Sequence, residues 1–128
     1  MNDTELLAGF LAGTLESFPH RDHVRTAYLL LESRGFDEAT IVLSDRIRAM
    51  AVAGGQPDKF HTTRTVAWMR LVAAAIEPDA AALTSDEFLL RRPHLLDSGL
   101  LNQYYSAELL GSLQSRARFV EPDLSPLN

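Results

Sequence analysis

The sequence predicts an all-α protein, and three observations lead to that prediction. Apolar residues recur every three to four positions through most of the chain, as expected for amphipathic helices. No alternating Val/Ile/Thr run and no Asn-Gly or Asp-Gly turn indicates a β-hairpin. Glycine and proline fall between the periodic segments, where they end helices. We therefore expect an antiparallel four-helix bundle-like core with additional short C-terminal helices.

The first half of the chain carries the four long helices. The first is expected from Thr4 to Ser17, with Asp3 as its N-cap and Phe18-Pro19 as its end. The second is expected from His20 to Ser33, before a glycine at Gly35 that suits a left-handed cap.

The third helix is expected from Asp37 to Ala53, with Asp37 as its N-cap and Gly54-Gly55 after it. The fourth is expected from His61 to Glu77 and ends before Pro78. Residues 1–77 would thus form a four-helix core.

The last third of the chain is more broken. We expect a short helix from Ser85 to Arg92, partial helix from Leu95 to Tyr105, and a last helix from Ser106 to Arg118. Residues 78–118 would pack on the core as short helices, and residues 119–128, which contain two prolines, would form an extended tail of this single domain.

Composition and charge exclude several classes of protein. The 128 residues are 46% hydrophobic, enough for one folded domain, and the absence of cysteine excludes thiolate chemistry and disulfides. The net charge of −5 argues against a general affinity for nucleic acid or an anionic membrane. No signal peptide or membrane-spanning segment is predicted, and no nucleotide-binding fingerprint is present, so we expect a cytoplasmic protein without a nucleotide cofactor.

Three histidines form the one pattern with a chemical interpretation. At about 100° per residue, His20 lies at the centre of the apolar face of its helix and His23 at the edge of that face. His61 is likewise centred on the buried face of the fourth helix. Because the second and fourth helices of an up-down bundle start at the same end, we expect the three imidazoles to meet there in one pocket.

Imidazoles in a pocket suit two kinds of chemistry. They can act as acid–base catalysts or ligand contacts, because neutral imidazole both donates and accepts near pH 7. Alternatively, His20, His23 and His61 could bind a transition metal such as zinc, copper or iron. A structural alternative stays open, in which the histidines satisfy hydrogen bonds at helix starts or cap neighbouring ends.

Other residues are candidates for contact with a small-molecule ligand. Arg64 lies about 60° from His61, and Trp68 lies two turns into the fourth helix on the same face. Tyr28 lies at the boundary of the second helix. Arg25, about 140° from His20, is expected to point to solvent or a helix flank, with ligand contact as the alternative.

The segment Phe18-Pro19-His20-Arg21-Asp22-His23-Val24-Arg25 resembles a motif in a family of small bacterial helical proteins of uncharacterised activity. The resemblance continues at Phe60-His61-Thr62-Thr63, except that Thr62 stands where the family pattern has Glu. It implies that His20, His23 and His61 act as one unit, and it implies no activity.

These patterns support three functional hypotheses. The first is an enzyme acting on a small polar metabolite, with His61 or His23 as base. The second is a non-catalytic interaction or accessory subunit, whose leucine-rich segment from Leu83 to Leu101 packs on a partner protein or on a second copy. The third is a tri-His metal-binding protein.

Overall fold

The structure, a computed structural model, describes residues 1–128 and is entirely helical, which confirms the predicted fold class. Three single-turn 3₁₀ helices lie between the α-helices, at Pro57–Lys59, Pro93–Leu96 and Leu100–Gln103. The α-helices are α1 (Asp3–Ala12), α2 (His20–Arg34), α3 (Phe36–Ala53), α4 (Thr62–Ala75), α5 (Ser85–Arg91), α6 (Ala107–Leu110) and α7 (Leu113–Ala117).

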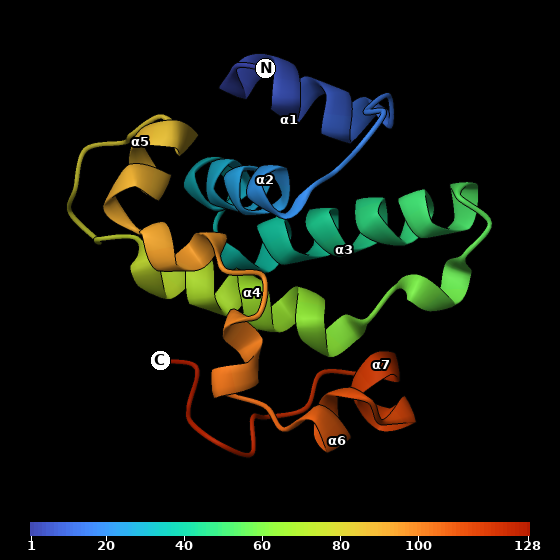
Figure 1. Ribbon diagram of the computed structural model, residues 1–128. Coiled ribbons are helices and arrows are strands. Elements are labelled where there is room, and N and C mark those ends of the chain that lie inside the picture. The colour runs from blue at the N-terminus through green and yellow to red at the C-terminus, as the bar shows by residue number, and fades with distance from the viewer.

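The four long helices form the centre of the molecule. Figure 1 shows α3 and α4 running alongside each other in opposite directions, with α2 above them and seen nearly end-on. α1 covers α2, α5 also packs against α2, and α6 and α7 lie below α4. This packing is compatible with a bundle-like core in which α2 is steeply inclined to α3 and α4.

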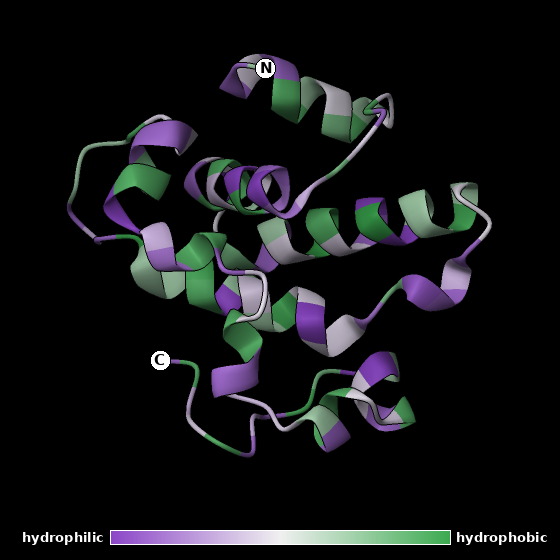
Figure 2. Ribbon diagram, viewed as in Figure 1, coloured by the Kyte–Doolittle hydropathy of each residue, from purple (hydrophilic) through white to green (hydrophobic).

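One continuous apolar core holds these helices together. Each of α1 to α4 carries alternating polar and apolar bands (Figure 2), and the apolar side is turned inward. The fully buried members come from early and late parts of the chain alike, including Phe10, Leu43, Met69, Leu95 and Tyr105. Burying such side chains stabilises the fold by about 1.5–3 kcal/mol each.

α1 differs from the prediction at both ends. Asn2, not Asp3, is its N-cap, and Asn2 and Glu5 form a reciprocal capping box. The helix ends at Ala12 rather than at Ser17, because Gly13 adopts φ 72° in the left-handed region, where only glycine lacks a steric penalty.

The C-terminal region is divided more finely than predicted. The helix expected from Ser106 to Arg118 is two single-turn helices, because the hydroxyl of Ser112 accepts a hydrogen bond from the amide of Ser115 and starts a second helix. Residues 119–128 contain no helix and lie against the core. The Tyr105 hydroxyl donates to the carbonyl of Val120 at 2.7 Å, and Leu127 is buried.

None of the helices combines the length and the apolar character needed to span a membrane.

Candidate functional site

The three histidines line one open pocket of about 260 Å³. His20 and His23 reach it from the first turn of α2, and His61 reaches it from the residue before α4. Periodicity and topology predicted this convergence. The remaining lining residues are Phe18, Ile47, Lys59, Phe60, Arg64, Thr65 and Trp68.

The ring of His61 is fully occupied by the protein itself. His61 is the N-cap of α4, and its Nδ1 accepts a hydrogen bond from the amide of Arg64 at 3.1 Å. Because Nδ1 accepts, the ring proton sits on Nε2, which donates to the carbonyl of Leu110 at 2.7 Å. Burial is the main cause that lowers the pKa of His61, and the guanidinium groups of Arg64 and Arg116 act in the same direction. His61 is therefore a neutral structural link between the start of α4 and the end of α6.

His20 has one ring nitrogen engaged. Its Nε2 lies 2.8 Å from the carbonyl of Leu95, and because a carbonyl only accepts, Nε2 must donate. The ring packs edge-on against Trp68, with 4.6 Å between ring centroids. In the neutral ring, Nδ1 is left as a free acceptor.

The ring of His23 makes no hydrogen bond to the protein, and its Nε2 is buried without a partner. The ring lies 6.3 Å from that of His20 and 5.7 Å from that of Phe18, measured between centroids. Burial, and to a smaller extent the charge of His20, lowers the pKa of His23 to about 4. His23 is thus neutral at pH 7, and no hydrogen bond fixes which nitrogen carries its proton.

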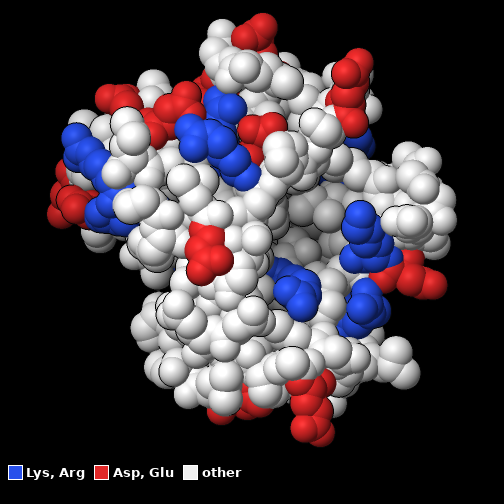
Figure 3. Space-filling view, viewed as in Figure 1, with Lys and Arg blue, Asp and Glu red and all other residues white.

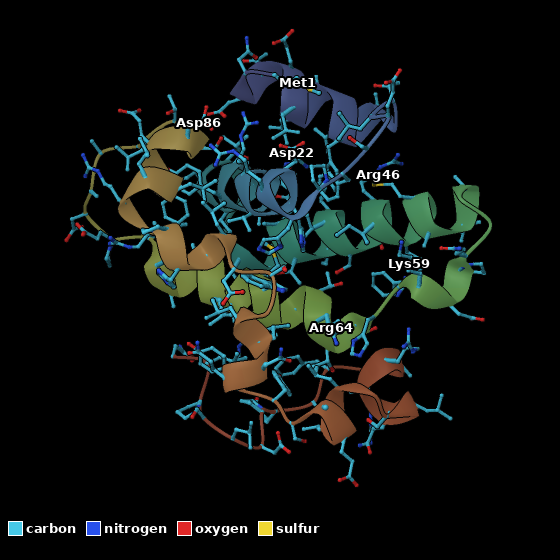
Figure 4. All side chains as sticks on the ribbon, viewed as in Figure 1. Met1, Asp22, Arg46, Lys59, Arg64 and Asp86 are labelled. Atoms are coloured by element: carbon cyan, nitrogen blue, oxygen red, sulfur yellow. The ribbon has the colours of Figure 1, made fainter.

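Two cationic side chains, one of which the sequence did not single out, complete the pocket. Figure 4 shows Lys59 after the third helix and Arg64 at the start of α4. Trp68, as predicted, lies in the wall. No pattern in the sequence singles out Lys59, Phe60 or Phe18, apart from their position one or two residues before a histidine.

Arg25 lies on a flank of α2, one of the two placements expected from the sequence, and it neither points to solvent nor lines the pocket. It is 5% exposed, and its guanidinium donates to the hydroxyl of Ser85, the carbonyl of Met1 and the carboxylates of Asp3 and Asp22. α1 and α5 cover this side of α2, as the positions of Met1, Asp22 and Asp86 show in Figure 4. Arg25 joins three helices.

Tyr28 is also placed away from the histidines. Its ring stacks on Phe88 with 4.2 Å between centroids. Its hydroxyl donates to the carbonyl of Leu83 and accepts from the amide of the same residue. It borders a separate cavity of about 30 Å³, so it is not a ligand contact of the histidine pocket.

Thr62 and Thr63 contact the C-terminal region through their hydroxyls. Thr63 donates to the carbonyl of Arg118 at 2.9 Å, and Thr62 faces the carbonyl of Ala117 at 3.4 Å. The cap of α4 is His61. Thr62, which departs from the motif of the resembling family, does not line the pocket.

The histidines are not arranged as metal ligands. No group of three or more His, Asp or Glu side chains is placed so that it could hold a metal ion. The reason is visible in the hydrogen bonds, since both nitrogens of His61 and one of His20 already bind backbone groups.

The chain matches no protein-family model, no curated protein and no solved structure. The resemblance of the histidine motif to a bacterial family stays a prediction.

Proposed function

We propose that the chain binds a small organic molecule in the histidine pocket and acts on it by histidine acid–base chemistry. The observation that carries this proposal is that His23 lines the pocket while its buried Nε2 has no hydrogen-bond partner in the protein. A buried polar atom without a partner costs about 1–3 kcal/mol of stability. Less than 1 Å² of this nitrogen is exposed, so the ring of His23 must turn toward the pocket for a ligand to reach it, and a hydrogen bond made there recovers that cost.

The three imidazoles support different roles. His61 cannot take up a proton without losing its cap, because its Nδ1 lone pair already accepts from the amide of Arg64. Neither nitrogen of His23 makes a hydrogen bond within the protein, although its Nε2 is buried, and Nδ1 of His20 makes none. Of the two bases that the sequence suggested, the geometry therefore favours His23, with His20 as the neighbour that orients the ligand.

In the proposed step, a proton moves from the ligand to the imidazole of His23. Neutral His23 accepts a proton from an acidic group of the ligand, so the ring becomes imidazolium and the ligand gains one negative charge. The reverse transfer, to the same or another ligand atom, restores the neutral ring. A pKa near 4 makes His23 a weak base in the empty pocket, and a negative charge on the ligand raises that pKa toward the range that suits catalysis.

A thermal-shift survey of small polar metabolites tests the proposal. A ligand present at about 100 times its Kd stabilises the folded state by about 2.7 kcal/mol, which is a clear rise in Tm for a domain of this size. We expect compounds that raise the Tm of the native chain and do not raise that of His23→Leu. His94→Gln, a change at an exposed histidine outside the pocket, is the matched control and should respond like the native chain.

Compounds that stabilise His23→Leu and the native chain equally would contradict the role of His23. The alternative of an interaction subunit has less support from the packing. Of the segment from Leu83 to Leu101, four leucines are buried in the chain's own core and Leu90 and Leu96 are exposed.

A further inference from the structure

We infer that the histidine pocket selects an amphipathic organic anion, with one carboxylate or phosphate head and an apolar chain or ring. This inference rests on the proposed function and names the class of ligand that the same site would take. Two independent features support it: the charges around the pocket, and an apolar groove that lies beside it.

The charged residues that line the pocket are both cationic. Lys59 and Arg64 are among its lining residues, whereas no Asp or Glu is, although the whole chain carries 17 acidic residues. Neither cation forms an ion pair within the protein, in contrast to the arginines at positions 21, 25, 34, 70 and 92. Figure 3 shows the hollow with Lys and Arg side chains gathered around its mouth.

A third cation adds to the positive potential. Arg116 of α7 donates to the carbonyl of Asp58, which places its guanidinium beside Lys59. α2 and α4 also direct their N-terminal ends at the pocket, and the partial positive charge of a helix N-terminus favours an anion. An anionic group in this pocket would lie near three cations from three different helices, Lys59, Arg64 and Arg116. It would also lie near the imidazoles of α2, which have unpaired nitrogens.

An apolar groove of about 290 Å³ adjoins the pocket along α3. Phe18, Ile47, Lys59 and Phe60 line both spaces, so the two lie side by side. Beyond them the groove is lined by Met50 and Ala51 and contains no further charge. The histidines and Arg64 lie only at the other end.

The separation of charged and apolar lining residues sets the orientation of the ligand. The anionic head lies between Arg64 and the histidines, and the apolar part follows Phe18 and Phe60 toward Met50. An inorganic anion would leave the apolar groove unused, and a neutral apolar molecule would leave Lys59 and Arg64 unpaired. The pattern of lining residues therefore fits a molecule that has both parts.

The emission of Trp68 gives a direct readout of binding, because Trp68 is the only tryptophan and lies in the pocket wall. The probes are octanoate and octyl phosphate, compared with octanol, which lacks the charge, and with acetate and inorganic phosphate, which lack the chain. We expect both amphipathic anions to change the emission, with affinities at least about tenfold above those of the other three. The stronger of the two anions identifies the head group.

Two pairs of variants separate the two halves of the site. Arg64→Ala should weaken octanoate about fivefold, whereas Arg34→Ala, the same change at the far end of α2, should not. Met50→Gln should weaken octanoate and leave acetate unchanged, whereas Val52→Gln, an exposed position on the same helix, should have no effect. Across butyrate, hexanoate and octanoate, affinity should rise about two- to fourfold per methylene.

Octanol binding as tightly as octanoate, with dependence on His23, would overturn the anionic class and leave the proposed function standing. Acetate binding as tightly as octanoate would show that the groove does not bind an apolar chain, and would overturn that part of the inference. If the metabolite survey also finds no compound whose effect depends on His23, the proposed function fails together with this inference.

Discussion

The imidazole of His61 joins the first turn of α4 to the carbonyl of Leu110 at the end of α6, with 2.7 Å between Nε2 and the oxygen. The same ring caps α4 through Nδ1. A histidine that the sequence placed at the centre of a catalytic cluster is thus a structural residue in the wall of that pocket. Its neighbours His20 and His23 keep the free nitrogens.

This assignment predicts how His61 responds to substitution. His61→Ala removes both a helix cap and a buried hydrogen bond, so the free energy of unfolding should fall by about 2–4 kcal/mol. His61→Asn keeps an N-cap acceptor and should recover about 1 kcal/mol of that loss. Urea denaturation of the three proteins gives the values. A His61→Ala protein as stable as the native chain would contradict the structural role.

Arg25 should matter far more for stability than Arg21, although the two lie one turn apart on α2. The Arg25 side chain is 6% exposed and contacts Asp3, Asp22 and Ser85, so Arg25→Ala should cost about 2–4 kcal/mol. The Arg21 side chain is 48% exposed in its pair with Asp86, so Arg21→Ala should cost less than about 1 kcal/mol.

Hydrogen exchange locates the consequence of losing Arg25. The amides of α1 should lose protection in Arg25→Ala and keep it in Arg21→Ala, because Arg25 binds the carbonyl of Met1 and the carboxylate of Asp3. Equal costs for the two substitutions, or unchanged protection of α1, would show that this network does not hold the helix.

The sequence predicts the positions of some residues of the candidate site and not of others. The positions of His20 and His61 follow from helical periodicity and from glycine and proline boundaries, both of which are local. The contacts of Arg25 could not be predicted, because the angle of about 140° from His20 says nothing of the later helix α5 that covers that face. Lys59 and Phe60 lie outside the long helices, where no periodicity indicates direction.

Stability should depend on pH through His23. The pKa of its ring is about 4 in the folded chain and about 6.5 when unfolded, so the unfolded state binds more protons between these values. The contribution of His23 is complete above about pH 6.5 and is lost as pH falls toward 4. Between pH 7 and pH 4.5 the loss should be roughly 2–3 kcal/mol.

The variant His23→Leu isolates this effect. It removes the titrating ring and the unpartnered nitrogen together, so it should be at least as stable as the native chain at pH 7 and lose less stability at pH 4.5. Urea denaturation at both pH values measures the difference. Equal losses in the two proteins would mean that His23 is not the group that titrates.

The division of roles among the three imidazoles is tested most directly by the nitrogen NMR spectrum of the histidine side chains at pH 7, with and without octanoate. We predict that His61 carries its proton on Nε2 and does not change when octanoate is added. We predict that His23 is neutral in the free protein and that its ring nitrogens shift most on binding. A His23 ring that is already protonated at pH 7, or that stays unchanged while the His61 ring shifts, would contradict the account.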